Sequence, residues 1–224
     1  MLSESIESGF QADVSYIQRP HSNSFAQNWM ASIQEIDSEW VVFLHDDDLL
    51  LPEYVQVIST HLNNAQSDVV AIAPNAEIIT ESGLSLGVYR KRGRFQRVQT
   101  QTAVLRAYFF SLTSRPPPFP SYCYRSNLLK SCSFMDAGRM ADVIFLMNLS
   151  QFGALEWLPN VLFQYRVQAD QDTRSINLSD LSKFVDIVGQ AWPRVYRAAF
   201  FIWLMIRLFR ARILWLLRFR ARSK

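Results

Sequence analysis

Hydrophobic and polar residues along the chain form blocks whose spacing suits strands and helices in alternation. Residues 39–45 and 68–79 carry nearly continuous apolar runs, which are typical of strands buried on both faces of a parallel sheet. Residues 154–167 indicate one or two further strands. Apolar positions at helical spacing predict helices over residues 22–37, 52–65, 100–112 and 140–153. This alternation predicts an α/β domain.

Glycine and proline indicate the connections between these elements. Residues 114–121 contain four prolines, which excludes a helix or a central strand there. Gly153 is expected to end the preceding helix as its C-cap. Residues 12–20 predict a short strand, and residues 121–132 a strand that enters a helix. A polar stretch with three glycines indicates a loop or hairpin: Gly83, Gly87 and Gly93.

Length and composition suit a globular domain. With 224 residues, of which 49% are hydrophobic, the chain can bury a sizeable core, which argues against wholesale disorder. Cys123 and Cys132 match neither a metal-ligand spacing nor a disulfide framework, so we expect a reducing compartment. Residues 1–18 lack a basic start followed by an apolar core, so we expect no signal peptide.

The net charge of +3 conceals an asymmetry. Residues 187–224 hold nine of the 23 Lys and Arg residues and no acid, which leaves 14 basic against 20 acidic residues in the rest of the chain. The basic character is therefore confined to the C-terminal segment. Nucleic-acid binding by the whole surface is not indicated.

The C-terminal segment differs from the body in composition, and we divide the chain into a domain over 1–180 and a helical tail over 181–224. The longest apolar run, residues 198–206, is nine residues long, whereas roughly 20 are needed to span a bilayer. Arg, Trp and Phe at this density favour an interfacial helix on the anionic cytoplasmic leaflet of a membrane. The alternative is a helix that packs on the domain or on a second subunit.

Three consecutive carboxylates, Asp46, Asp47 and Asp48, follow the first apolar run. Adjacent carboxylates repel one another, and burying one without a partner is costly. A divalent cation with oxygen ligands offsets this repulsion, and Mg²⁺ or Mn²⁺ shared with a diphosphate suits the ligand set. Strand ends of open α/β sheets are also where ligands bind. The alternative is a solvated turn whose charges favour the start of a helix at Pro52.

The stretch "NWMASIQEIDSEWVVFLHDDDLLLPEYV", residues 28–55, resembles the centre of a family-2 glycosyltransferase with the GT-A nucleotide-sugar-binding fold. That family typically shows an asparagine-bearing helix, an apolar strand, an acidic cluster of the DxD type and a proline. These parts stand here in order, at Asn28, Val41 to Leu44, Asp46 to Asp48, and Pro52. The resemblance covers roughly residues 14–172. It implies a GT-A-like, Rossmann-like mixed sheet flanked by helices, to which the tail adds a basic hydrophobic helix.

The resemblance also implies roles for the cluster. Asp46 is expected near the ribose or sugar of a nucleotide-sugar donor, and Asp47 with Asp48 is expected to hold the metal on the diphosphate. Asn28 and His45 are grouped with the donor-binding residues. Since many relatives have an aspartate at the position of His45, it stays open whether this residue is a ligand or only a neighbour of the metal.

Sugar transfer with inversion needs a base that takes the proton from the attacking hydroxyl group. By resemblance this base is Asp142, because relatives commonly carry an acidic residue at the start of the corresponding helix. The alternative is an ordinary aspartate favoured by the helix dipole. Asp136 is a weaker candidate for the base. Ala141 departs from the Glu-Asp pair that is frequent in the family.

Two further segments match regions of the family. Tyr165 and Arg166 correspond to its Tyr-Arg-x-His region, with Gln168 in the place of the histidine. Arg166 is expected to contact the donor phosphate, or else to form an internal ion pair. Phe119 and Tyr122 lie in the proline-rich segment, which relatives place near the acceptor, and are predicted to bind it by stacking. Their alternative role is to pack the loop.

Relatives begin with two strands that form the nucleotide-base pocket, and no matching residues precede Ala12. Three explanations stay open: a fragment, which we favour; strands supplied by another polypeptide; or an inactive relative.

We therefore expect an inverting, metal-dependent glycosyltransferase. It would move a sugar from a nucleotide-sugar donor to a saccharide or lipid-linked acceptor in cell-surface polysaccharide synthesis. We expect it in the cytoplasm, peripherally attached through its tail to the inner face of the cell membrane, without nucleic acid; a homo-oligomer also stays open. The alternatives are an inactive truncated relative that acts as a membrane-bound scaffold and, less favoured, a metal-dependent nucleotidyl- or phosphotransferase.

Overall fold

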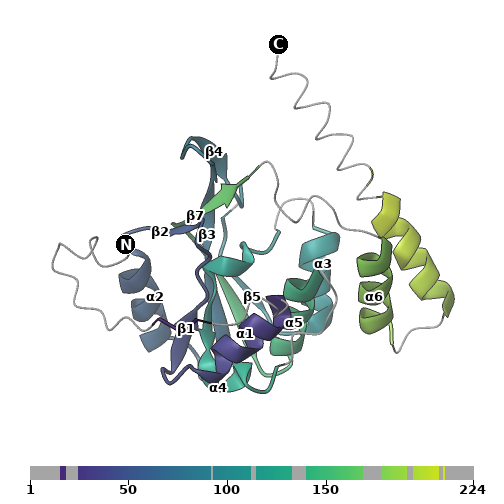
Figure 1. Ribbon diagram of the computed structural model, residues 1–224, viewed down its shortest axis with the longest axis horizontal. Helices are drawn as coiled ribbons and strands as arrows, with labels where there is room; N and C mark the ends of the chain where they lie inside the picture. The colour runs from purple at the N-terminus through teal and green to yellow at the C-terminus, as the bar shows by residue number, and fades with distance from the viewer. Residues whose placement is uncertain are drawn as a thin grey trace, which may run out of the picture.

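The computed structural model shows a mixed sheet with helices on both faces (Figure 1). It describes residues 16–18, 25–91, 93–111, 115–132, 140–168, 178–190, 194–206 and 209. Of the strand predicted over 12–20, only residues 16–18 are described, and these three are not in a strand. Asp136 lies outside the described residues, as does most of the basic end of the tail.

Two long parallel strands form the centre of the sheet. These are β3 (Val69–Thr80) and β7 (Ala154–Val167), which pair along most of their length. On one side of them lie β6 (Cys123–Arg125) and β1 (Trp40–Val42), both antiparallel to their neighbours. β2 (Leu49–Leu50) pairs antiparallel with β7 on the other side. The order among the described strands is therefore β1-β6-β3-β7-β2.

Two shorter strands complete the sheet. β4 (Ser85–Val88) forms a hairpin with the end of β3, and β5 (Gln96–Val98) pairs with the start of β7. Gly83 and Gly87 have positive φ angles of 82° and 108°, a conformation that side chains other than glycine rarely adopt. The hairpin predicted from the glycines is confirmed.

The helices form one layer on each face of the sheet (Figure 1). α2 (Tyr54–Asn63) covers one face, where Tyr54 and Ile58 pack against Ile72 and Leu158. The larger core lies on the other face, under α1 (Phe25–Gln34), α3 (Gln101–Phe109) and α5 (Ala141–Leu149). A 3₁₀ turn (Phe119–Ser121) and the short α4 (Ser126–Leu129) flank β6. The predicted α/β class and the mixed sheet are confirmed.

The strand predicted over residues 39–45 differs from the one in the structure. Only Trp40–Val42 form a strand, all three residues are partly exposed, and their pairing with β6 is antiparallel. The prediction of a fully buried parallel strand was therefore wrong. β1 lies at one end of the described sheet, and the rest of the apolar run packs from the loop that follows, where Phe43 contacts Trp29 and Tyr124.

Gly153 is not the C-cap of α5, because that helix ends at Leu149 and Ser150 caps it. A Cβ atom added at Gly153 would lie 2.0 Å from the backbone oxygen of Asp68 and 2.6 Å from Cγ1 of Val70. Glycine is required here because the chain passes directly against the start of β3. The amide of Ala154 then donates to the same Asp68 oxygen, at 2.8 Å.

The described part of the C-terminal segment consists of α6 (Leu178–Val188) and a helix over 194–206. Leu181, Phe184 and Val185 of α6 are buried in the larger core, as are Phe200 and Leu204 of the second helix. Among the helices that the structure describes, none has both the length and the apolar character needed to cross a membrane.

Candidate active site

The acidic loop lies between two strands that fix both of its ends. β1 ends at Val42, and Leu49 and Leu50 of β2 pair with Gln164 and Phe163 of β7. The chain therefore turns at residues 43–48 toward the far end of β7, where the amide of Asp48 donates to the carbonyl of His45. This connection places three carboxylates beside the last residues of the central strand.

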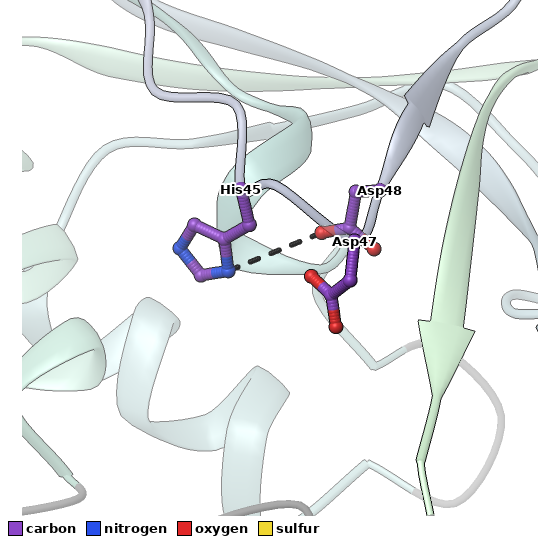
Figure 2. Close-up of side chains that lie close together, drawn as sticks. All are labelled: His45, Asp47 and Asp48. Atoms are coloured by element: carbon purple, nitrogen blue, oxygen red, sulfur yellow. Dashed lines mark ion pairs between the residues drawn. The ribbon is translucent and has the colours of Figure 1, made fainter. Parts of the chain in front are cut away.

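His45, Asp47 and Asp48 converge on one point of this loop (Figure 2). One ligand atom from each of them lies within 4.8 Å of the others, and His45 Nδ1 is 4.0 Å from Asp48 Oδ2. Imidazole nitrogen and carboxylate oxygen are both ordinary metal ligands. Asp46 lies at the same turn and is exposed to solvent.

Asp48 is the buried member of this group, with 4% of its surface exposed. Burial, together with the charges of the neighbouring Asp47 and Asp46, raises the pKa of its carboxyl group to about 7, while the hydrogen bond from the amide of Arg166 opposes the shift. Among the described residues, Asp48 Oδ2 is buried without a hydrogen-bond partner. A buried carboxylate in this state is stabilised by a cation.

His45 is a further candidate ligand for a cation. Burial lowers the pKa of its imidazole, although the charges of Asp47 and Asp46 raise it, so the ring favours the neutral form that binds metals. The ring packs edge-on against Trp29, with centroids 5.9 Å apart. Its Nδ1 is the ring nitrogen that faces Asp48 (Figure 2). The residues present thus fit a divalent cation, with His45 as a third candidate ligand beside Asp47 and Asp48.

The end of β7 holds the acidic loop in place. The amide of Arg166 donates to Asp48 Oδ1 at 2.9 Å, and its Nε donates to the carbonyl of Asp47 at 2.7 Å. Nη1 donates to the carbonyls of Thr80 and Glu81, each at 2.9 Å. One side chain therefore ties the loop to the end of β3. The geometry favours a positioning role for Arg166, while its predicted contact with the donor stays a prediction.

Gln168 adds a further contact, because its Nε2 donates to Asp47 Oδ2 at 3.0 Å. In the place where the resemblance expects a histidine, this amide orients a carboxylate of the cluster. An amide nitrogen is a hydrogen-bond donor and no metal ligand, so Gln168 supports the ligand from outside the cluster.

Asp142 lies in the first turn of α5, and its Oδ1 accepts a hydrogen bond from the amide of Val143 at 2.8 Å. Burial raises the pKa of its carboxyl group to about 6, against the effect of that hydrogen bond. Burial raises the pKa of Tyr165, and the charges of Asp48, Asp142 and Asp47 add to this effect. Tyr165 is therefore within electrostatic reach of both the acidic cluster and Asp142, which the structure brings to the same region.

The remaining predicted residues lie around this region. Asn28 is on α1, one residue before Trp29, and its Oδ1 is buried without a partner among the described residues. Phe119 is 8% exposed, and Tyr122 is fully buried with its ring stacked on Tyr124 at 5.6 Å. Burial favours the packing role for these two rings, while their acceptor contact stays a prediction.

Two residues near Asp142 were not predicted from the sequence. Tyr89 packs edge-on against Tyr165, with centroids 5.7 Å apart, and the Arg115 guanidinium lies 4.6 Å from the centre of the Tyr89 ring. Burial raises the pKa of Tyr89, Arg115 opposes this shift, and the charge of Asp142 adds to it. Arg115 precedes the proline-rich run, so a basic residue beside a stiff loop was the available signal.

A second charged cluster lies at the other end of β7 and has a different character. Glu156 is 5% exposed and contacts two basic partners, His61 Nε2 at 2.7 Å and the guanidinium of Arg97. Arg97 also contacts Asp68. Both carboxylate oxygens of Glu156 are thus occupied by protein groups. This cluster ties α2 and β5 to β7 and leaves no ligand atom to a cation.

Comparison with known proteins identifies a family whose matched region includes the acidic loop. The model of glycosyl transferase family 2 matches residues 2–116, which is more than half of the chain and includes the cluster. No curated protein matches. The crystal structure of S. aureus TarS 1-349 is similar with a TM-score of 0.45 and 15% identity, over 70% of this chain and 43% of that chain. The chain spans less than half of that structure. The match over residues 2–116 shows that this chain belongs to glycosyl transferase family 2.

Proposed function

We propose that the chain transfers a sugar from a nucleotide-sugar donor to a hydroxyl group of a saccharide or lipid-linked acceptor. The observation that carries this proposal is the acidic loop, where His45, Asp47 and Asp48 bring ligand atoms within 4.8 Å of one another and the buried Oδ2 of Asp48 lacks a hydrogen-bond partner among the described residues. Membership of the family supplies the reaction class. The donor sugar, the acceptor and the inverting course belong to the proposal.

The acidic loop would hold the cation. Asp47 and Asp48 present carboxylate oxygens and His45 presents a nitrogen, and the hard oxygen ligands favour Mg²⁺ or Mn²⁺. When bound, such a cation neutralises the charge of the donor's diphosphate. Asp46 is exposed at the same turn and is the residue that we assign to the ribose or sugar of the donor. Arg166 and Gln168 keep the loop in its conformation.

Asp142 is assigned the part of the general base. Its carboxylate takes the proton of the acceptor hydroxyl group while that oxygen forms a bond to the anomeric carbon. The bond from the anomeric carbon to the diphosphate breaks, and the nucleoside diphosphate leaves with the electron pair. A base works best when its pKa is close to the working pH, and the raised pKa of about 6 favours this role over that of an ordinary surface aspartate.

The test is the release of nucleoside diphosphate from a panel of nucleotide sugars, with Mn²⁺ and with saccharide or lipid-linked acceptors. We expect Asp47→Asn and Asp142→Asn each to reduce release by about 10²-fold or more. Asp37→Asn is the matched control, because Asp37 is an exposed carboxylate in the connection between α1 and β1. It is expected to keep the wild-type rate.

Different results separate the alternatives. Loss of release in Asp47→Asn with full release in Asp142→Asn would remove Asp142 from the mechanism. A nucleotidyl- or phosphotransferase would release a nucleoside monophosphate or a sugar phosphate in place of the nucleoside diphosphate, and Asp142→Asn would not change that product. Full transfer in both variants would contradict the proposed mechanism.

A further inference from the structure

The helix over 194–206 has two apolar faces, and only one of them is packed. On the inner face, Phe200 and Leu204 are 8% and 1% exposed. Phe200 contacts Phe109 of α3 and Phe184 of α6, with ring centroids 6.1 Å and 6.4 Å apart. This face is part of the larger core.

Further contacts fix the helix on the domain. Trp203 stacks on Phe110 at the end of α3, with centroids 4.4 Å apart and an interplanar angle of 14°. Arg197 pairs with Asp186 of α6, with Nη1 and Oδ1 3.5 Å apart. Gly189 lets the two helices approach, since a Cβ atom there would lie 2.6 Å from Cγ of Arg197. The helix is therefore a fixed part of the domain surface.

The outer face of the same helix carries apolar side chains that the described part of the chain leaves exposed. Val195, Ile202 and Ile206 are 69%, 58% and 55% exposed. Ile202 and Ile206 follow Val195 by seven and eleven residues, which is close to two and three turns of an α-helix, so the three side chains lie in one stripe. Phe209, 66% exposed and 14 residues after Val195, continues it. Scattered exposed apolar residues are ordinary, but a continuous apolar stripe marks an interaction surface.

Basic residues at the start of this helix and after it indicate which partner the stripe binds. Residues 207–224, which follow directly on this helix, contain seven Lys and Arg residues and no acid. Arg194 at the start of the helix is exposed as well. An anionic phospholipid surface offers both apolar contact and opposite charge. A second copy of the chain would instead bring two strongly basic segments together.

We propose that the stripe formed by Val195, Ile202, Ile206 and Phe209 docks on an anionic membrane surface. Because the opposite face of the helix is packed into the core, docking would hold the whole domain in one orientation at the membrane. This inference does not depend on the proposed transferase activity. It gives a specific face to the attachment that the composition of the tail predicts.

The test is flotation of the full-length chain with vesicles of phosphatidylcholine and phosphatidylglycerol in equal parts. We expect the wild type to float with these vesicles and to remain unbound with pure phosphatidylcholine. The double variant Ile202→Asp/Ile206→Asp should lose about tenfold or more of the binding. Val55→Asp is the matched control, because Val55 is a 65% exposed apolar residue on the helix α2. It should bind like the wild type.

The substituted side chains are exposed, so circular dichroism should show the same thermal unfolding for the variants as for the wild type. Equal flotation of the double variant and the wild type would overturn the proposal, as would no binding by the wild type. Sedimentation supplies the remaining outcome: a dimer that dissociates in the double variant, without vesicle binding, would assign the stripe to a second copy instead.

Discussion

Replacing Asp142 by asparagine should stabilise the protein at neutral pH while it removes the proposed base. Asparagine has nearly the same shape and keeps an oxygen that accepts the hydrogen bond from the amide of Val143. It has no charge to lose on burial. A catalytic carboxylate that is held in an unfavourable environment should therefore show opposite effects on activity and on stability.

The magnitude follows from the pKa of the carboxyl group, which burial raises from the ordinary 3.8 to about 6. In the range between these values the unfolded chain has lost the proton and the folded chain still binds it, so stability falls as the pH rises. Each unit of difference between the two pKa values corresponds to about 1.4 kcal/mol, so the charged carboxylate destabilises the folded state by at most about 3 kcal/mol. Asp142 keeps part of its surface accessible, and a negative charge at the start of α5 is itself favourable. Solvent screening and the lost dipole interaction reduce the expected gain to about 1–2 kcal/mol.

The assay is urea unfolding of the wild type and Asp142→Asn, followed by circular dichroism between about pH 4 and about pH 8. We expect the variant to be more stable at the upper end of this range and the difference to vanish at the lower end. The same variant should fail to release nucleoside diphosphate. A variant that is less stable than the wild type at about pH 8 would refute the reasoning, because the helix-dipole role would then outweigh the cost of burial.

Three further predictions concern the loop, the pH dependence of transfer and the sheet. Arg166→Met should lower the affinity for Mn²⁺ about tenfold or more in a calorimetric titration, because it removes the three hydrogen bonds from the guanidinium group to the carbonyls of Asp47, Thr80 and Glu81. The control Arg106→Met, at an exposed arginine, should keep the wild-type affinity. The rate of nucleoside diphosphate release should rise with pH through about 6, as Asp142 loses its proton, and a flat profile would remove it as the base. Gly153→Ala should lower the free energy of unfolding in urea by about 3 kcal/mol, since its Cβ atom would overlap the Asp68 carbonyl. Gly83→Ala, whose Cβ atom would meet no atom within 4 Å, should lower it by about 1 kcal/mol through its positive φ alone.

The periodic elements of the fold could be predicted from the sequence. The helices α2, α3 and α5 and the long strands β3 and β7 carry their pattern within one segment, because the buried face of each recurs along its own residues. The direction and the partner of β1 could not be predicted in this way. They depend on β6, whose Arg125 pairs with Trp40 from 85 positions further along the chain.

The candidate site could be predicted in its residue types but not in its contacts. Three adjacent aspartates required an explanation from their charge alone, whereas the part of Arg166 depends on carbonyl groups of Asp47 and Thr80, which carry no side-chain signal. The burial of Tyr122 is a similar case. The sequence left open whether this ring faces an acceptor or packs its loop, and the structure buries it in the larger core.

The central claim is that the acidic loop holds a divalent cation together with a diphosphate. The most direct measurement is calorimetric titration of the full chain with Mn²⁺ and a panel of nucleoside diphosphates, in parallel with Asp47→Asn and the control Asp37→Asn. We expect diphosphate binding that requires Mn²⁺ in the wild type and the control and that is lost in Asp47→Asn. No binding by the wild type, or equal binding by Asp47→Asn, would contradict it.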